Sequence, residues 1–195
     1  MKRKSEVRAS VLAARRAVAL EVRANADVLS VKFLCSLVAS DSIVSAYVPM
    51  TTEPGGDLLL DALSATGAQV LLPVLRDDLD LDWAVYTGDL VDGPKGMREP
   101  VGPRLGVGAI GSAATVVVPA VAVDRRGTRL GRGGGSYDRA LARAQGLVVA
   151  LLYPGELVDE LPAEAHDQPV HLAHDGHRAY WTEAGRMTHH WHSGL

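Results

Sequence analysis

The chain has 195 residues, of which 47% are hydrophobic and 22% charged, and its formal net charge is −3. This length and composition suit one globular domain, 1–195, and the slight negative charge does not favour a general nucleic-acid binder. The single cysteine, Cys35, excludes an internal disulfide and is typical of a cytoplasmic protein. No apolar run is long enough to span a membrane. We therefore expect a cytoplasmic protein without nucleic-acid or membrane partners, either a monomer or at most a weak dimer.

Helical and strand patterns alternate along the chain. Apolar residues at helical spacing predict helices at 2–39, 58–66 and 136–145, the second of them capped by Asp57. Strand patterns occur at 43–48, 69–75, 81–86, 115–123 and 147–153, and residues 88–114 are expected to form a long loop. This alternation indicates a single α/β domain with a mostly parallel sheet, covered by helices on both faces. In such sheets the ligand site lies beyond the carboxyl ends of the strands.

Two clusters of charged or titratable residues allow more than one interpretation. Lys4 and Arg8 lie in the first turns of the first helix, where cations oppose the helix dipole. Spacing alone favours a solvated basic face over an anionic partner. The segment from His174 to the C-terminus contains five histidines, but it lacks a matching acid or thiol pattern, so we expect a surface tail rather than a metal site. Within it, we expect residues 176–195 to be poorly ordered.

The segment 124–138 reads DRRGTRLGRGGGSYD and directly follows the apolar strand pattern at 115–123. Glycines allow backbone N–H groups to turn toward an anion, arginines suit phosphate, and the helix that follows adds a partial positive charge. The segment lacks the Gly-Lys-Ser/Thr ending of a Walker A loop and fits the dinucleotide-binding pattern poorly. It predicts a phosphate-binding loop, with a solvated surface loop as the simpler alternative.

The same segment resembles the signature of the 5-formyltetrahydrofolate cyclo-ligase family, which reads roughly P-G-[VLA]-[AG]-F-D-x-x-G-x-R-L-G-[RH]-G-x-G-Y-Y-D. The chain matches it at Pro119, Asp124, Gly127, 129–135, Tyr137 and Asp138, and departs from it at Ala120, Val123 and Ser136. The resemblance implies a NagB/RpiA/CoA transferase-like α/β fold. It also implies ATP-dependent cyclisation of 5-formyltetrahydrofolate to 5,10-methenyltetrahydrofolate through a phosphorylated N5-formyl (iminium phosphate) intermediate, with release of ADP and phosphate. Two alternatives stay open: a sugar-phosphate isomerase-like enzyme of related fold, and a folate- or nucleotide-binding module without turnover.

The resemblance also implies which residues form the site. For MgATP they are Lys4, Arg8, Arg129, Leu130, Gly131, Arg132, Gly133, Gly134, Gly135, Ser136 and Tyr137. For the folate substrate they are Val48, Glu53, Arg132, Gly133, Gly134, Gly135 and Ser136. Arg129, Arg132 and Tyr137 are the implied catalytic residues, and Asp138 and Asp167 the implied ligands of a Mg²⁺ cofactor.

Some positions depart from the family pattern or leave a role open. Gly134 stands where some relatives carry Lys, Ser136 where they carry Tyr, and His171 where they usually carry Asp. The run 93–100 resembles a family segment over the folate site, and its Glu99 is equally compatible with a turn residue and a ligand contact.

Overall fold

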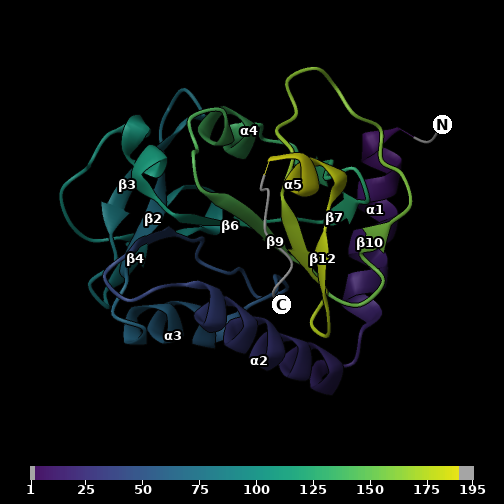
Figure 1. Cartoon of the computed structure of the whole chain (residues 1–195), viewed down its shortest axis with the longest axis horizontal. Coiled ribbons are helices and arrows are strands. Elements are labelled where there is room, and N and C mark those ends of the chain that lie inside the picture. Colours follow the sequence, from purple (N-terminus) through teal and green to yellow (C-terminus); the bar gives the residue numbers. More distant parts are fainter. Residues whose placement is uncertain (1–2, 189–195) are drawn as a thin grey trace.

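The structure, a computed structural model, describes residues 3–188. Its centre is a seven-stranded sheet with the order β12-β11-β9-β6-β1-β2-β3 (Figure 1). The strands are β1 (Ile43–Ser45), β2 (Gln69–Leu75), β3 (Leu81–Val85), β6 (Thr115–Pro119), β9 (Leu147–Leu151), β11 (Leu172–His174) and β12 (Ala179–Trp181). The four pairings among β11, β9, β6, β1 and β2 are parallel, and the edge strands β3 and β12 are antiparallel to their neighbours. The predicted mostly parallel α/β sheet is confirmed.

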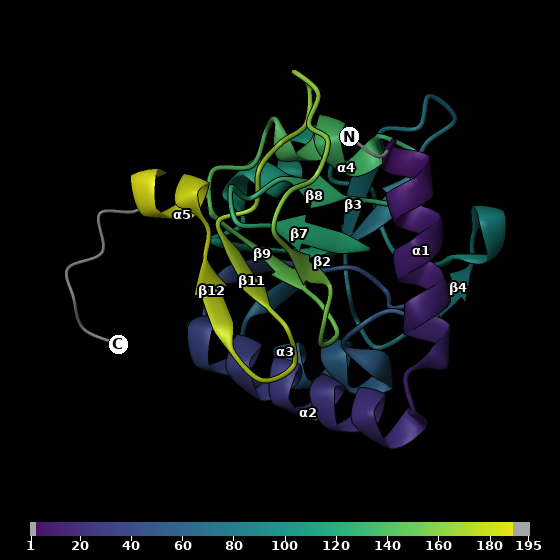
Figure 2. The same cartoon turned by 90° about the vertical axis from the view of Figure 1, so that its right-hand side faces the viewer.

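Helices cover both faces of this sheet (Figures 1 and 2). On one face lie α2 (Leu20–Leu37) and α3 (Leu59–Ala65), the latter preceded by the 3₁₀ turn η1 (Gly56–Leu58); on the other lie α4 (Ser136–Leu141) and the 3₁₀ helix η3 (Val107–Ser112). The central strand β6 serves both faces. Val117 packs in the core under α2 and α3, whereas Val116 and Val118 pack in the core that includes Ile110 and Leu141. A strand buried on both sides reads as an uninterrupted apolar run, which is why this element could be predicted.

A second, three-stranded sheet carries the N-terminal helix. Its order is β10-β7-β8, and the strands are β7 (Ala122–Asp124), β8 (Arg129–Leu130) and β10 (Leu157–Val158). The helix α1 (Lys4–Ala17) lies beside this sheet in both views, with Val7, Val11 and Leu12 against its small core (Figures 1 and 2).

The prediction of one helix over 2–39 is wrong. Val18 and Ala19 adopt extended backbone conformations between α1 and α2. No glycine or proline marks this break in the sequence. The two halves pack on different sheets, so tertiary packing overrides a locally continuous helical pattern.

The prediction of a single strand over 115–123 is also wrong, because this segment forms two strands. β6 stays in the large sheet and ends at Pro119, and β7 begins at Ala122 in the small one. The carbonyl oxygens of the connecting residues Ala120 and Val121 accept hydrogen bonds from Arg15 at 2.8 and 3.4 Å. Arg15 is itself buried in an ion pair with Glu156 at 2.6 Å. This network satisfies backbone groups that a continuous ladder would otherwise have paired.

Three smaller expectations need correction. The predicted loop 88–114 contains a hairpin of β4 (Leu90–Asp92) and β5 (Arg98–Pro100), joined by the 3₁₀ turn η2 (Pro94–Gly96), and then η3. Asp57 does not cap the second helix, because its side chain makes no capping hydrogen bond and η1 precedes α3. The helix expected over 136–145 ends at Leu141.

The C-terminal segment joins the fold earlier than expected. His174 is a buried residue of β11, hydrogen-bonded to Ser30 at 3.0 Å and stacked on Phe33 with ring centroids 4.4 Å apart. The prediction of a surface tail beginning at His174 is therefore wrong. Two further elements, β12 and α5 (Glu183–Thr188), follow β11. Residues 189–195 of the expected tail lie outside the described residues.

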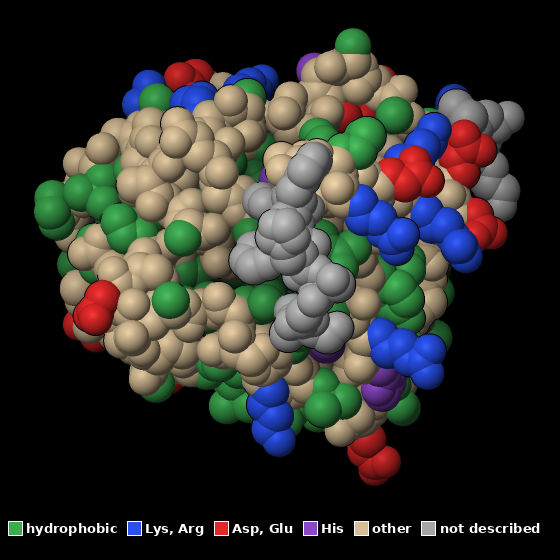
Figure 3. Space-filling model, in the orientation of Figure 1, with side chains coloured by type: hydrophobic (Ala, Val, Ile, Leu, Met, Phe, Trp, Pro, Cys, Tyr) green, Lys and Arg blue, Asp and Glu red, His purple; other side chains and the backbone are tan. Residues whose placement is uncertain are grey.

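The surface carries both signs of charge. On the face in Figure 3, basic side chains along the right-hand edge lie beside acidic ones. Arg125 pairs with Asp159, and Arg126 with Glu160, each at 3.4 Å. Among the helices described, none is long and apolar enough to cross a membrane.

Candidate active site

A cavity of about 580 Å³ opens beyond the carboxyl ends of β1, β2 and β6, where the strand pattern places a ligand site. Seven segments of the chain line it: the start of α1, residues 47–53, residues 73–81, the turn and strand 95–99, residues 119–121, the glycine-rich loop with the start of α4, and residues 164–167. All the residues that the sequence analysis assigned to ATP, folate or magnesium lie on its lining, namely Lys4, Arg8, Val48, Glu53, Arg129, Leu130, Gly131, Arg132, Gly133, Gly134, Gly135, Ser136, Tyr137, Asp138 and Asp167.

The glycine-rich segment is held in place by the buried carboxylate of Asp124. This side chain accepts hydrogen bonds from the backbone N–H groups of Arg126, Gly127, Thr128 and Leu161 at 2.9 to 3.1 Å. Four backbone donors on one carboxylate fix the turn between β7 and β8. Gly127 lies at φ +102°, where a Cβ would meet the carbonyl oxygen of Val170 at 2.5 Å, so only glycine fits there.

After β8 the chain winds around the cavity and enters α4. Gly133 and Gly135 have φ values of +105° and +70°, which other residues rarely adopt. The backbone N–H groups of Gly133 and Gly134 donate no hydrogen bond to any described residue. Ser136 is the first residue of α4, and Gly135 occupies the cap position. The loop therefore offers free backbone donors at the edge of the cavity, as an anion requires.

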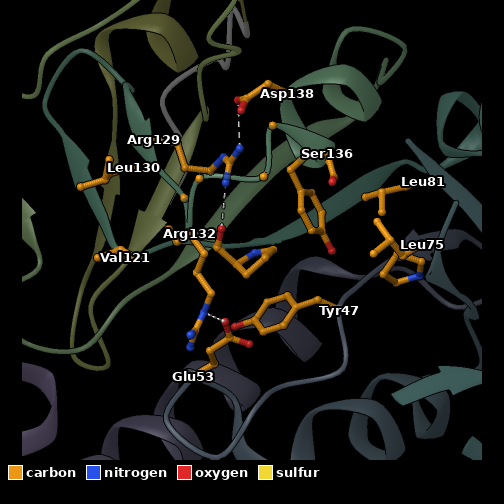
Figure 4. Close-up of a pocket in the computed structure, with 18 of the residues that line it drawn as sticks. Tyr47, Glu53, Leu75, Leu81, Val121, Arg129, Leu130, Arg132, Ser136 and Asp138 are labelled. Atoms are coloured by element: carbon orange, nitrogen blue, oxygen red, sulfur yellow. Dashed lines mark hydrogen bonds and ion pairs between the residues drawn. The ribbon is translucent and has the colours of Figure 1, made fainter. Parts of the chain in front are cut away.

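Arg129 is buried within the wall of the cavity. Its side chain is 3% exposed and pairs with Asp138 at 2.9 Å, while its other terminal nitrogen donates to the carbonyl oxygen of Pro119 at 3.2 Å (Figure 4). The guanidinium carbon lies 5.7 Å from the centre of the Tyr137 ring. The Tyr137 hydroxyl is buried and has no hydrogen-bond partner among the described residues. Burial raises the pKa of this phenol well above its usual value, so the group is a neutral donor.

Two further cations, Arg132 and Arg8, donate hydrogen bonds to other segments that line the cavity. Arg132 donates to Glu53 at 2.8 Å, and Glu53 also accepts the backbone N–H of Met50 at 3.0 Å (Figure 4). Arg8 donates to the carbonyl oxygen of Gly131 at 2.8 Å. These contacts attach both the 47–53 segment and α1 to the glycine-rich loop.

Lys4 pairs with the acids of the 164–167 segment. Its ammonium lies 2.7 and 2.9 Å from the two carboxylate oxygens of Asp167, and 3.3 Å from Glu164. Burial alone would lower the pKa of Lys4, but these acids outweigh it and the pKa lies above its usual value. Burial would likewise raise the pKa of Asp167, yet the hydrogen bonds from Lys4 and the Glu164 N–H bring it below its usual value. Both groups are therefore charged at neutral pH.

Magnesium prefers carboxylate oxygens and retains several water molecules, so it needs only one or two acidic side chains. One oxygen of Asp138 accepts from Arg129, and the other has no hydrogen bond from any described residue. Ligand atoms of Glu164, His166 and Asp167 lie within 4.8 Å of one another. The carboxylate oxygens of these residues fit a hard cation. The Lys4 ammonium contacts both oxygens of Asp167, so it must move away before Asp167 can bind a cation through both of them.

Several lining residues were not identified from the sequence. Tyr47 lines the cavity beside Val48, but its hydroxyl already donates to the Pro54 carbonyl at 2.6 Å. Lys95 and Arg98 line the cavity from the segment in which only Glu99 had been singled out. Glu99 accepts the backbone N–H of Leu75 at 3.0 Å, so it joins β5 to β2 as well as lining the cavity. His171, which stands where relatives usually carry Asp, is absent from the lining and accepts the Val148 N–H at 3.1 Å.

The α/β fold and a cavity lined with cations, free backbone donors and carboxylates are typical of an enzyme that takes an anionic ligand. The sequence matches the profile of the 5-formyltetrahydrofolate cyclo-ligase family over residues 1–174. The 5-formyltetrahydrofolate cyclo-ligase of Mycolicibacterium smegmatis is 46% identical over 172 residues, which cover 84% of this chain and 89% of that protein. The cyclo-ligase of Haemophilus influenzae is 30% identical over 65% of this chain and 72% of its own length.

Solved structures agree with this relationship. The 5,10-methenyltetrahydrofolate synthetase of Aquifex aeolicus aligns with a TM-score of 0.77 and 30% identity, over 91% of this chain and 92% of that one. The Mycoplasma pneumoniae 5,10-methenyltetrahydrofolate synthetase shares the fold, with a TM-score of 0.71 and 18% identity over 89% of this chain and 99% of that one. The chain belongs to the 5-formyltetrahydrofolate cyclo-ligase family.

Proposed function

We propose that this protein catalyses the ATP-dependent cyclisation of 5-formyltetrahydrofolate to 5,10-methenyltetrahydrofolate, with release of ADP and phosphate. The observation that supports this assignment best is that every residue expected to bind ATP, folate or magnesium lines one cavity. The match to the family profile over residues 1–174 also supports it.

The reaction requires activation of an amide oxygen, which is otherwise a poor leaving group. The N5-formyl oxygen attacks the γ-phosphorus of ATP and ADP leaves, giving an iminium phosphate at N5. N10 then attacks the formyl carbon, loses its proton, and the C–O bond breaks to release phosphate. Since no protein nucleophile takes part, the residues have to position the reactants and stabilise charge on the transferring phosphoryl group.

The side chains of the cavity suit those tasks. We assign Arg132, Arg129 and the N–H groups of the glycine-rich loop to the phosphates. Arg129 is held by Asp138 and Pro119. The side chain of Arg132 is 44% exposed, and Glu53 is its only ion-pair partner within residues 3–188, so Arg132 can turn toward a phosphate. We assign the buried Tyr137 hydroxyl, which lacks a partner among the described residues, to a polar atom of the bound substrate.

Three ion pairs join residues of the cavity wall: Lys4–Asp167, Arg129–Asp138 and Arg132–Glu53. MgATP carries both a cation and anions, so it can replace both partners of such a pair. ATP alone would satisfy Lys4 and leave Asp167 without a counter-charge. When bound, Mg²⁺ neutralises phosphate charge and orients the phosphoryl group, and we propose that Asp138 and Asp167 hold it.

A nucleotide-binding measurement tests the assignment against a sugar-phosphate isomerase of related fold, which the comparisons do not favour. Calorimetric titration should show binding of MgATP, and weaker binding of ATP in the presence of a chelator. An absence of nucleotide binding would contradict the proposal. A monomeric state and a cytoplasmic location stay predictions, which sedimentation and localisation of the tagged protein would test.

A further inference from the structure

Two cations on the cavity wall differ from the others in having no hydrogen-bond or ion-pair partner in the part of the chain that the structure describes. Six Lys and Arg side chains line the cavity. Lys4, Arg8, Arg129 and Arg132 each donate to an acid or a carbonyl oxygen at 2.7 to 2.9 Å. Lys95 and Arg98 are exposed, and neither forms a hydrogen bond or an ion pair with any described residue. Asp92 is the register partner of Arg98 across β4 and β5, yet no ion pair joins them within 4.0 Å.

Lys95 sits on a turn with an unusual backbone, and Arg98 begins the strand that follows it. Lys95 has φ +58° and ψ +26°, a left-handed conformation that costs a non-glycine residue free energy. Hydrogen bonds from Gly93 N–H to the Met97 carbonyl at 2.8 Å and from Met97 N–H to the Pro94 carbonyl at 3.1 Å close the turn. A flexible loop would relax such a conformation, so the hairpin holds Lys95 and Arg98 in place at the wall.

The position of the pair within the cavity points to one part of the substrate. Val48, Met50, Met97 and Arg98 line both this cavity and an adjoining groove, whereas the glycine-rich loop and α1 line only the cavity. Arg98 therefore lies where the cavity opens into the groove, with apolar side chains beside it, and Lys95 lines the cavity three residues earlier on the same hairpin. A folate with its formyl group at the phosphate-binding loop must extend the rest of the molecule away from that loop. The end of that extension is a glutamate, which carries two carboxylates.

We propose that Lys95 and Arg98 form the binding subsite for the glutamate carboxylates of the folate substrate. The inference deepens the proposed function and rests on it. Guanidinium forks bind carboxylates in bidentate fashion, and a lysine adds a mobile second charge. Apart from Arg98, the charged side chains that line the adjoining groove are Asp27, Asp57 and Asp92, which repel a carboxylate and keep it at the end where Arg98 and Lys95 lie. The neighbouring apolar residues suit the aromatic ring that links the pterin to the glutamate.

The test compares Arg98→Gln, Lys95→Gln and the double variant with two controls that remove the same charges elsewhere. The controls are Arg76→Gln and Lys32→Gln, whose side chains are exposed and do not line the cavity. Two substrates are used: 5-formyltetrahydrofolate, and the corresponding 5-formyltetrahydropteroate, which lacks the glutamate. The Michaelis constant is measured for each, together with the equilibrium dissociation constant in the absence of ATP.

For 5-formyltetrahydrofolate, the double variant should raise the Michaelis constant and the dissociation constant about fivefold or more, and added salt should reduce the difference. The turnover number and the Michaelis constant for ATP should change less than about twofold, the controls should match the wild type, and the pteroate should bind all the proteins equally. An unchanged dissociation constant for 5-formyltetrahydrofolate, an equal loss with the pteroate, or a larger effect on ATP would overturn the subsite. Absence of product from the wild type would instead count against the proposed function, and the equilibrium constants would still decide the subsite.

Discussion

Replacing Asp138 with asparagine should change both the stability and the magnesium dependence of the protein, for separate reasons. Asp138 lies 2.9 Å from a guanidinium whose side chain is 3% exposed. Removing one partner of a buried ion pair costs roughly 3–5 kcal/mol. Asparagine keeps the acceptor oxygen, and the Asp138 side chain is 18% exposed, so we expect a loss of about 2 kcal/mol. For a chain of this length that corresponds to a melting temperature lower by about 4–8 °C.

The metal assignment adds an effect that stability alone does not produce. If Asp138 holds magnesium, the concentration that supports half-maximal turnover should rise at least about tenfold, which corresponds to about 1.4 kcal/mol of lost affinity. Asp167→Asn should shift it in the same direction.

A matched control separates the two effects. Glu156→Gln neutralises a carboxylate in another buried ion pair, 2.6 Å from Arg15, that does not line the cavity. It should lower the melting temperature by a comparable amount and leave the magnesium titration unchanged. If Asp138→Asn and Glu156→Gln give the same magnesium titration, the reasoning about Asp138 is refuted.

Three further predictions follow from the site and the core. Arg132→Ala should reduce turnover about a hundredfold or more, because it removes a donor to developing charge, while the fold survives; near-normal turnover in a steady-state assay would remove Arg132 from the phosphate site. Lys4→Ala and Arg8→Ala should each raise the Michaelis constant for ATP more than that for folate, and equal effects on both substrates would count against their assignment. Burial lowers the pKa of His174, so the unfolded chain binds its proton more readily; stability should fall as the pH drops below about 6.5, and His174→Gln should flatten this dependence of the melting temperature. The exposed control His177→Gln removes only a neighbouring charge that adds to the effect of burial, so it should keep most of the wild-type slope; a wild-type slope in the His174 variant would show that the buried imidazole does not cause it.

Local sequence predicted the parts of the site that are continuous in the chain. The apolar run of β6, the glycine-rich loop and the start of α4 follow one another within 115–138, and their order alone indicated a ligand loop at the end of a buried strand. The carboxylate of Asp124 that organises this loop is likewise a local feature of the motif.

Contacts between distant segments could not be predicted in the same way. Lys4 and Asp167 are 163 residues apart, and only the packing of α1 on the small sheet brings them together. The break between α1 and α2 and the switch of the chain from β6 to β7 also depend on tertiary contacts, above all those of Arg15. Where family resemblance assigned Lys4 and Asp167 to separate ligands, the structure pairs them with each other.

The most direct test of the central claim is to mix the wild-type protein with 5-formyltetrahydrofolate, magnesium and ATP and to follow the absorbance of the methenyl product. Methenyltetrahydrofolate should form only when ATP is present, with one ADP and one phosphate released for each molecule of product. Absence of product, or product formed at the same rate without ATP, would contradict the assignment of this cavity to an ATP-dependent cyclo-ligase.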